Sequence, residues 1–505
     1  MSDNQREAGT IILDPTHASF APEETVHDLG ATHFIGIGGA GMSVLAEMLH
    51  EQGVEVDGSD REPSAKTDRL QSLGITVEFG QQAKNVEGKN TVVFSSAIKP
   101  DNPEIVAAHE AGERIVHRSD ILALLMNAKR AVTVAGAHGK TTTSSMLAHI
   151  LVNAGEGELA DPSYAIGGSI QGKDGAILDG GHAGKGNVLV AEADESDGSF
   201  AKYHPQIAII TNSEADHLDH YGTQDNYRAA FVDHAGHATK AVIMCGDDEG
   251  NLAVLRALDA TVAGRTIVYS TRNAAELGDL NGATLVRIES ESETAESGAE
   301  HFTLHIPGGL IGEEERRIAV TLTVPGIHNA RNASAAIIAA ALLGMDVERA
   351  SAAVTSFLGA ARRFQVRGTV SQVTVVDDYA HHPTEIRATM EAAENCAHRT
   401  LWCVFQPHTY TRTKALLDDF AAALSLADHV VLADIYAARE TDTLGISSKD
   451  IQERIVKLGT ACEYFPSFAE IENYLNENLA EGDMLITMGA GDVVKIGEEL
   501  LASEK

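Results

Sequence analysis

The sequence predicts an α/β protein of three domains, and three observations lead to this prediction. The chain has 505 residues, 44% of them apolar, which is enough to bury several cores. Apolar strands alternate with helical stretches in two successive series and again at the end of the chain. The first two series each contain a glycine-rich turn between a strand and a helix.

The first series follows residues 1–28, which lack apolar periodicity and which we expect to form a flexible, dispensable tail. The pattern then predicts a parallel α/β unit, and we assign residues 29–127 to the first domain. We expect strands at 33–38, 54–60 and 91–96, and helices at 42–52 and 101–111.

The second series predicts a central domain over residues 128–358 and the last series a third α/β domain over 359–505. An antiparallel β insertion is expected late in the central domain, with the acidic run between its first two strands forming a solvated hairpin tip. The central strands are expected at 131–136, 187–194 and 206–212, the insertion strands at 284–288, 301–306 and 318–324, a helix at 329–343, and the strands of the third domain at 373–378, 400–406, 429–435 and 483–489.

Composition excludes several function classes. The formal charge of -35 opposes binding to nucleic acid or to an anionic membrane, because both require a basic surface. The longest apolar stretch, residues 335–345, is shorter than the ~18 residues of a membrane-spanning helix, and the first thirty residues carry no signal pattern. Four cysteines without metal-site spacing argue against a disulfide framework or a zinc site. We expect a cytoplasmic protein.

The first glycine turn (residues 36–41) reads G-x-G-x-x-G and stands between a predicted strand and a predicted helix. Glycines there permit a tight turn, and the free N–H groups at the start of the helix can bind a diphosphate. Ser59 and Asp60 follow at the distance where a ribose is recognised, so NAD stays open as a ligand. A purely structural glycine turn is the other alternative.

The second glycine turn (residues 136–141) reads G-x-x-G-K-T and also joins a strand to a helix. Its amides are expected to surround phosphate oxygens, Lys140 to neutralise charge on the β- and γ-phosphates, and the Thr141 hydroxyl to bind Mg²⁺. This pattern predicts a nucleoside triphosphate site.

Metal ligands are expected where neighbouring strands end beside the second glycine turn. Glu192 ends one predicted strand, and His217 follows the next. We predict that both bind a hard cation. A solvated acidic loop stays open as the explanation for Asp194, Glu195 and Asp197.

Two glycine turns in separate domains indicate two phosphorylated ligands, and at this point a family becomes recognisable. The segments GIGGAGMS, GAHGKTTT, EADESD, TNSEADHLD, PGIHNARNA, RRF, DDYAHHP and QPHTYTRT occur in this order. Together they closely resemble the Mur ligase family and, within it, the ligases that join L-alanine to UDP-N-acetylmuramate. The resemblance runs from about residue 31 to the end. It implies Rossmann-like first and third domains around a P-loop ATPase-like central domain.

The resemblance also implies a role for each matching residue. UDP-N-acetylmuramate would be bound by Gly36, Gly38, Gly39, Ala40, Gly41 and Ser59, and by Ser95, Ser96 and His117. ATP would be bound by Gly136, Ala137, His138, Gly139, Lys140, Thr141, Thr142, His328, Asn329, Asn332, Arg363 and Asp378. The metal ligands would be Thr141, Glu192 and His217, the alanine contacts Tyr379, His381, His408 and Arg412, and the catalytic residues Lys140, His217, Arg363, His382 and Arg412. A helix cap is the alternative for Asn329, and a core role is the alternative for His381 and His382.

The implied reaction forms an acyl phosphate from the muramoyl carboxylate and ATP, with Mg²⁺ (or Mn²⁺) as cofactor, and then an amide with L-alanine. The sequence departs from the family pattern at Ala380, where glycine is usual, and at Thr409, where a basic residue is frequent. No carbamylated lysine is assigned. A sister ligase that attaches a preformed peptide, an NAD-dependent oxidoreductase and a regulatory nucleotide-binding protein are the alternatives. The oligomeric state stays open between monomer and homodimer.

Overall fold

The computed structural model describes residues 11–21, 23–168, 170–171, 177–214, 216–290, 299–438 and 440–503. The chain divides into two compact units, which are described separately. The first unit comprises Met1–Glu289, Thr303–Ala319 and Arg331–Val354, and the second comprises Ser290–Phe302, Val320–Ala330 and Thr355–Lys505. The first unit therefore holds the predicted first domain and most of the central one.

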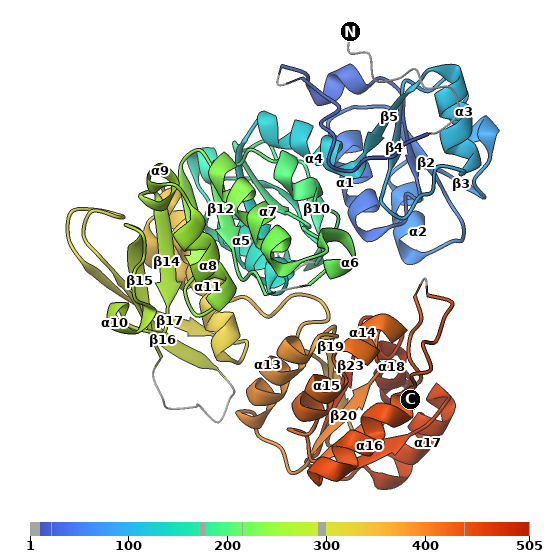
Figure 1. Cartoon of the computed structure of the whole chain (residues 1–505), viewed down its shortest axis with the longest axis vertical. Helices are drawn as coiled ribbons and strands as arrows, with labels where there is room; N and C mark the ends of the chain where they lie inside the picture. The colour runs from blue at the N-terminus through green and yellow to red at the C-terminus, as the bar shows by residue number, and fades with distance from the viewer. Residues whose placement is uncertain are drawn as a thin grey trace. The chain divides into compact units, whose positions relative to one another are not determined.

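A five-stranded parallel sheet forms the first domain, in the strand order β3-β2-β1-β4-β5. Its helices flank the sheet, as Figure 1 shows. Strand β1 lies between β2 and β4, so the first glycine turn leaves the sheet where the strand order reverses, the usual ligand position in such sheets. The elements are β1 (Thr32–Ile35), α1 (Ala40–Glu51), β2 (Val56–Asp60), α2 (Ala65–Ser72), β3 (Thr76–Phe79), β4 (Thr91–Phe94), α3 (Pro103–Ala111), β5 (Arg114–His117) and α4 (Arg118–Asn127).

A ten-stranded sheet forms the central domain, in the order β10-β7-β11-β6-β12-β13-β14-β15-β16-β17. The predicted insertion strands are the last three strands of this sheet, and the predicted tip of their hairpin, residues 291–298, lies outside the described residues. The strands are β6 (Arg130–Ala135), β7 (Ser163–Ala165), β10 (Gly181–His182), β11 (Val188–Glu192), β12 (Ile207–Ile210), β13 (Ala241–Cys245), β14 (Thr266–Ser270), β15 (Thr284–Ser290), β16 (Glu300–Ile306) and β17 (Arg316–Leu322), and β8 (Ile170–Gln171) and β9 (Ile177–Leu178) form a separate pair.

The helices associated with this sheet follow the order of the chain. They are α5 (Lys140–Ala154), α6 (Leu218–Tyr221), α7 (Gln224–His237), α8 (Glu249–Ala257), α9 (Ala260–Ala263), α10 (Ala274–Leu277), α11 (Ile327–Leu342) and α12 (Val347–Val354). Strand β6 lies between β11 and β12 and pairs in parallel with both. The second glycine turn therefore emerges between the ends of β11 and β12.

The third domain is a six-stranded sheet in the order β18-β19-β23-β20-β21-β22, parallel except for β18. Separate apolar clusters pack on its two faces, one around Phe405 and Phe420 and the other around Trp402 and Leu485. The elements are β18 (Gln365–Val370), β19 (Val373–Asp378), α13 (Pro383–Glu394), β20 (Leu401–Phe405), α14 (Tyr410–Ala415), α15 (Leu417–Leu424), β21 (His429–Leu432), α16 (Ser448–Leu458), β22 (Ala461–Tyr464), α17 (Phe468–Asn478), β23 (Met484–Met488) and α18 (Val494–Ala502).

Local sequence explains why these elements begin and end where they do. Helix α3 illustrates this, because the Asn102 side chain accepts a hydrogen bond from the Glu104 amide, Pro103 occupies the first turn, and Gly112 ends the helix at φ +72°. Strand β12 is apolar throughout and β11 is apolar up to Glu192 at its end, as expected for strands covered on both faces.

Segment 14–20 lies within the predicted flexible tail and makes side-chain and carbonyl contacts with the first unit. The Ser19 hydroxyl donates to Asp120 Oδ2 at 3.0 Å, and the carbonyl of His17 accepts from Lys202 Nζ at 3.0 Å. The Arg114 guanidinium lies over the Phe20 ring, 5.0 Å from its centroid. The sequence does not reveal these contacts, because they use carbonyls, a hydroxyl and one ring, which produce no apolar periodicity.

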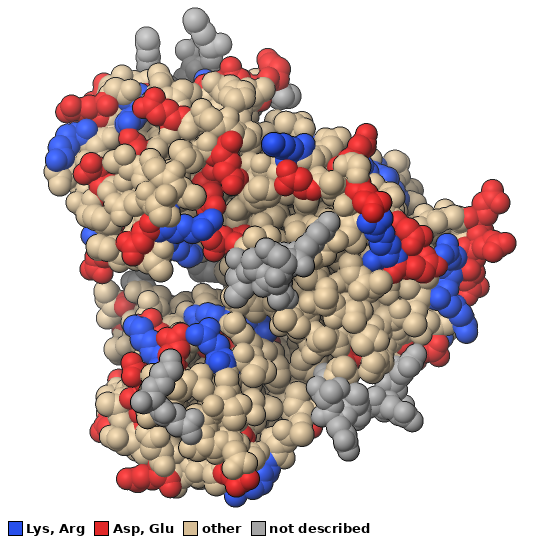
Figure 2. All heavy atoms as spheres, turned by 180° about the vertical axis from the view of Figure 1, so that it is seen from behind, with Lys and Arg blue, Asp and Glu red and all other residues tan. Residues whose placement is uncertain are grey.

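Acidic and basic side chains are intermingled on the face of the molecule drawn in Figure 2. No helix in the described part of the chain combines the length and apolar character needed to cross a membrane.

Candidate active site

The first glycine turn is held by the neighbouring strand β2. The amides of Gly36 and Ile37 both donate to the carbonyl of Ser59, and the Gly38 amide donates to Asp60 Oδ2 at 2.8 Å. Helix α1 begins at Ala40, so the amides at 40–42 have no carbonyl acceptor within the helix. These amides are where an anionic group can bind.

Ser59 and Asp60 differ in what they do at this turn. The Ser59 side chain is fully buried and donates to Glu104 Oε2 at 2.7 Å, away from the turn. Only its carbonyl supports the glycine turn, whereas the Asp60 carboxylate reaches the turn directly. The predicted ligand role of the Ser59 hydroxyl therefore has no support in this geometry.

The second glycine turn is held by residues that follow β12. The Thr211 hydroxyl donates to the His138 carbonyl at 2.6 Å, and the His138 amide donates to Asn212 Oδ1 at 3.1 Å. Gly136 has φ +136°, and a Cβ there would lie 2.2 Å from Thr211 Oγ1. Any side chain at position 136 would therefore displace this support.

Lys140 lies within the second glycine turn and is paired with a carboxylate. Its Nζ donates to the Gly136 carbonyl at 2.6 Å and to Glu195 Oε1 at 3.1 Å. Burial alone would lower the pKa of Lys140, but Glu195 and Asp194 outweigh it and raise that pKa. The ammonium group is therefore charged and available to a phosphate that displaces Glu195.

The predicted metal ligands lie around this lysine. Glu192 is the last residue of β11, beside β6, and its Oε1 accepts from Ser144 Oγ at 3.3 Å. His217 Nε2 lies 3.7 Å from Glu195 Oε1, and Thr141 is the second residue of α5. Glu195 Oε2 is buried 3.0 Å from Lys140 Nζ, yet it accepts no hydrogen bond from any described residue. A hydroxyl, carboxylates and an imidazole form a donor set that suits a divalent cation such as Mg²⁺ or Mn²⁺.

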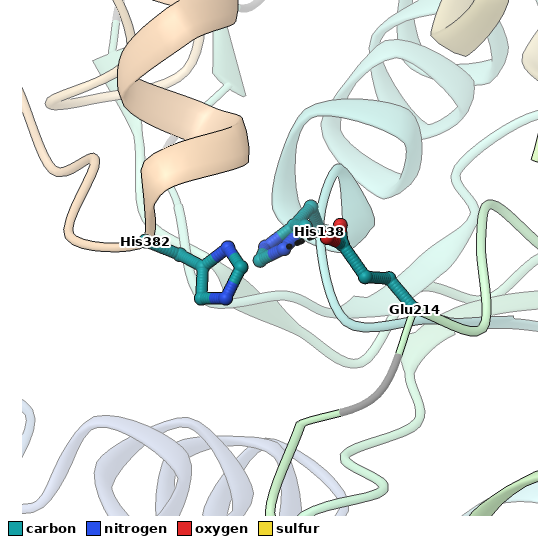
Figure 3. A group of neighbouring side chains, drawn as sticks. All are labelled: His138, Glu214 and His382. Atoms are coloured by element: carbon teal, nitrogen blue, oxygen red, sulfur yellow. Dashed lines mark ion pairs between the residues drawn. The ribbon is translucent and has the colours of Figure 1, made fainter. Parts of the chain in front are cut away.

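His138 also faces a carboxylate. Its Nε2 lies 3.5 Å from Glu214 Oε2, the ion pair drawn as a dashed line in Figure 3. The same figure labels His382, which belongs to the second unit and precedes helix α13. There its Nδ1 lies 3.4 Å from the Thr384 amide and caps the helix.

The predicted residues Ser96 and His117 meet Asp197, which comes from the loop after β11. The Ser96 hydroxyl donates to Asp197 Oδ2 at 2.5 Å, and His117 Nε2 lies 3.1 Å from Ser96 Oγ. His117 Nδ1 accepts from the Ser119 amide at 3.4 Å and lies 2.8 Å from Ser119 Oγ. Burial lowers the pKa of His117 to about 4, so this network assigns a neutral ring with the proton on Nε2. Ser95 contributes its carbonyl to a turn, accepting from the Ile98 amide at 2.9 Å.

The start of α11 carries the predicted adenine contacts. In the first unit, Asn332 Oδ1 accepts a hydrogen bond from Thr143 Oγ1 at 3.1 Å. The same oxygen lies 2.9 Å from the point that a Cβ would occupy if Gly139 were replaced by a larger residue. In the second unit, Asn329 Nδ2 donates to the Pro325 carbonyl at 2.7 Å. Asn329 is the third residue of α11, so it is not the residue that caps the helix. His328 lies against Gly326, where a Cβ would be 2.6 Å from the ring.

The second unit brings the predicted alanine contacts together. The Tyr379 and His381 rings have centroids 5.5 Å apart, and those of His381 and His408 are 5.6 Å apart. The Arg363 guanidinium lies 5.4 Å from the centroid of the Tyr379 ring, and Arg412 lies on α14. Burial lowers the pKa of His381 to about 4, so this imidazole is neutral.

Asp378, which directly precedes Tyr379, is buried. Its carboxylate accepts from the amides of Phe364 and Ala380 at 2.8 and 2.7 Å and from Thr389 Oγ1 at 3.2 Å. Burial raises its pKa to about 6. The sequence departs from the family pattern at Ala380 and Thr409. Ala380 does not have a positive φ, so an alanine fits here while its amide donates to Asp378, whereas Thr409 has φ +65°.

Sequence reasoning missed two further features of the site. Arg118 and Asp194 form an ion pair of 2.7 Å, although nothing in their sequence neighbourhood pairs them. The Lys140–Glu195 pair was also missed, because a solvated acidic loop was an alternative explanation for Glu195. The Glu195 side chain is fully buried, which excludes that explanation.

Comparisons with known proteins agree with this architecture. Residues 31–130 match the family model "Mur ligase family, catalytic domain", residues 134–340 match "Mur ligase middle domain", and residues 362–491 match "Mur ligase, glutamate ligase domain". The chain is 82% identical to a UDP-N-acetylmuramate–L-alanine ligase of Bifidobacterium adolescentis, over 99% of this chain and 98% of that protein. A ligase of the same name from Renibacterium salmoninarum is 43% identical, over 94% and 96% of the two chains.

Among solved structures, the chain is similar to the UDP-N-acetylmuramate-alanine ligase of Thermotoga maritima. The TM-score is 0.75 at 28% identity, over 94% of this chain and 98% of that chain. Family models cover all three domains and a relative well above 30% identity matches nearly the full length, so the chain belongs to the Mur ligase family.

Proposed function

We propose that this chain joins the carboxylate of UDP-N-acetylmuramate to the amine of L-alanine, with hydrolysis of ATP to ADP and phosphate. The observation that carries the proposal is the second glycine turn. Its charged residue Lys140 lies beside the carboxyl end of β11, where Glu192 is the last residue of the strand. The 82% identical relative named UDP-N-acetylmuramate–L-alanine ligase supports the choice of substrates. The proposed setting is the cytoplasm, where ATP and sugar nucleotides are available.

The first step transfers a phosphoryl group to the substrate carboxylate. A carboxylate oxygen attacks the γ-phosphorus of ATP, the bond to the β,γ-bridging oxygen breaks, and ADP leaves. Lys140 stabilises the charge on the γ-phosphate oxygens, with Gly136 and Gly139 permitting the turn that presents its amides. Thr141, Glu192 and His217 would hold Mg²⁺, which supplies further neutralisation of phosphate charge.

The second step forms the amide. The alanine ammonium group first releases a proton to solvent, and the free amine then attacks the carbonyl carbon of the acyl phosphate. The nitrogen loses a second proton as the bond from the carbonyl carbon to the phosphate oxygen breaks and phosphate leaves the tetrahedral intermediate. We assign the alanine to the cluster of Tyr379, His381, His408 and Arg412, in which the arginine suits the substrate carboxylate. The His381 ring is neutral and adds no positive charge to this cluster. It therefore does not repel the ammonium group of L-alanine as the substrate binds.

A coupled phosphate-release assay tests this proposal. UDP-N-acetylmuramate, ATP, Mg²⁺ and a panel of amino acids are supplied together and with each component left out in turn. We expect phosphate release only with the full mixture and L-alanine as the best amine. Release with a tripeptide but not with L-alanine would identify a peptide-recycling ligase, and release that needs no amine would indicate a nucleotide-hydrolysing switch. A bound nicotinamide spectrum would support the oxidoreductase alternative.

A further inference from the structure

The first glycine turn contains no lysine or arginine, in contrast to the second. Residues 36–43 read GIGGAGMS, so a diphosphate at this turn would meet only backbone amides from the turn itself. Amides and the helix N-terminus attract anions, but a diphosphate group carries more than one negative charge. A cation from elsewhere in the fold would complete the site.

Arg118 supplies a cation at this position. It is the first residue of α4 and directly follows β5, whose carboxyl end shares the sheet edge at which the first glycine turn lies. Its Nη1 lies 3.2 Å, and its Cζ 3.8 Å, from the position that a Cβ at Gly41 would occupy. The guanidinium group therefore lies against the N-terminus of α1, beside the amides that have no acceptor within the helix.

Asp194 fixes the direction of this guanidinium group. Arg118 Nη2 donates to Asp194 Oδ2 at 2.7 Å, and Asp194 Oδ1 accepts from the Ser196 amide at 3.1 Å. The planar guanidinium has further N–H donors for an anion.

We propose that Arg118 is the side-chain cation of the sugar-nucleotide site, where it donates to the diphosphate over the start of α1 while Asp194 holds its orientation. This inference rests on the proposed function, which places a nucleoside diphosphate at the first glycine turn. The absence of a side chain at Gly41 then leaves room for the guanidinium group, because a side chain there would displace this group from the ligand.

Binding of UDP and of a non-hydrolysable ATP analogue to the full-length protein tests the inference by titration calorimetry. Arg118→Met should raise the Kd for UDP about tenfold to a hundredfold, the usual effect of losing charged hydrogen bonds. The Kd for the ATP analogue should change less than about threefold. Arg118→Lys should recover part of the UDP affinity, because it restores the charge. Arg114→Met is the matched control, since this arginine lies on β5 but pairs with Glu24.

The possible outcomes separate this inference from the proposed function. Failure of the unaltered protein to bind UDP would overturn the proposed site itself. Normal UDP binding by folded Arg118→Met, or equal loss of both ligands with a lower melting temperature, would overturn the inference alone. If that variant does not fold, Arg118→Met/Asp194→Asn removes both charges of the pair. Its UDP affinity should fall as far, and an unchanged affinity would refute the proposal.

Discussion

The two glycine turns are built alike but obtain their positive charge differently. Each follows a strand in the interior of a sheet, begins a helix, and is held by residues at or just beyond the end of a neighbouring strand. The second turn carries Lys140 in its own sequence. The first lies against Arg118, which belongs to a helix four strands further along the chain. A cation inside a motif is visible in the sequence, whereas one supplied from another helix becomes visible only in the folded chain.

The largest expected effect is the loss of the cation inside the second turn. Lys140→Ala should reduce kcat about a hundredfold or more, because no other residue of the turn can neutralise the γ-phosphate. The measurement is the coupled phosphate-release assay, with folding checked by circular dichroism. Lys240→Ala is the control, since Lys240 donates to the Leu342 carbonyl elsewhere in the same unit. Near-normal turnover in a folded Lys140→Ala protein would refute the role of this turn.

Metal dependence should distinguish the two turns. Glu192→Gln and His217→Ala should each raise the Mg²⁺ concentration for half-maximal rate about tenfold, because each removes one proposed ligand. UDP binding at the first turn should be the same with and without a chelator. Glu249→Gln, an exposed carboxylate on α8, is the control.

A proton-transfer role for these two residues would give a different result. The substrate carboxylate is already ionised at neutral pH, so the first step needs no general base. An unchanged Mg²⁺ response together with the loss of one limb of the pH–rate profile would assign Glu192 or His217 to acid–base chemistry instead.

Removal of residues 1–21 should affect the first turn more than the second. Ser19 and the carbonyl of Pro15 contact Asp120 and Ser119, which directly follow Arg118. The truncated protein should show a KM for UDP-N-acetylmuramate raised about threefold, with the KM for ATP unchanged, because a few exposed contacts contribute little. Equal kinetic parameters in the two proteins would show that this segment is dispensable, as its sequence predicted.

The smallest effect concerns the link between α1 and the central sheet. His182 lies 3.5 Å from Glu51 Oε1, at the end of α1, and 2.8 Å from Asp161 Oδ1. The hydrogen bond to Glu51 outweighs burial and raises the pKa of His182 to about 9. The stabilisation is therefore complete below the unfolded pKa near 6.5 and is lost as the pH rises through 9.

Melting temperatures between pH 6 and pH 10 test this link. The unaltered protein should lose a few degrees more than His182→Gln as the pH rises from about 7 to 10, because only the unaltered protein has this proton to release. Parallel curves would show that the His182 ion pairs contribute nothing measurable.

The sequence was sufficient for the fold class and for most strands, because buried parallel strands are mainly apolar. It did not reveal β3, β5, β7, β8, β9, β10, β13, β14, β18 or β22. In β3, only Val77 is buried, and β22 has the short sequence ACEY, of which only Cys462 is buried. Strand β18 is a polar edge strand that pairs in the antiparallel direction. Such strands are defined by their partners and have little periodicity of their own.

Sequence motifs predict as much of the candidate site as local spacing allows. Both glycine turns, and Glu192 at the end of β11, were found because their elements are contiguous in sequence. The sequence singles out Asp60 only by its distance along the chain from the glycines, and it does not predict the hydrogen bond from the Gly38 amide to Asp60. Arg118, Asp194 and Glu195 act through pairs whose members come from different elements, and no local pattern predicts such pairs.

The carboxylate that occupies Lys140 has a consequence for inhibitor chemistry. An inhibitor that presents an anion to this lysine has to replace Glu195. Its binding free energy is therefore reduced by the cost of breaking an existing buried ion pair. An uncharged compound that occupies the nucleotide site leaves the ion pair intact and avoids this cost. The preferred starting compounds against this protein are therefore neutral adenosine mimics, whereas phosphate mimics gain less from Lys140 than its charge suggests.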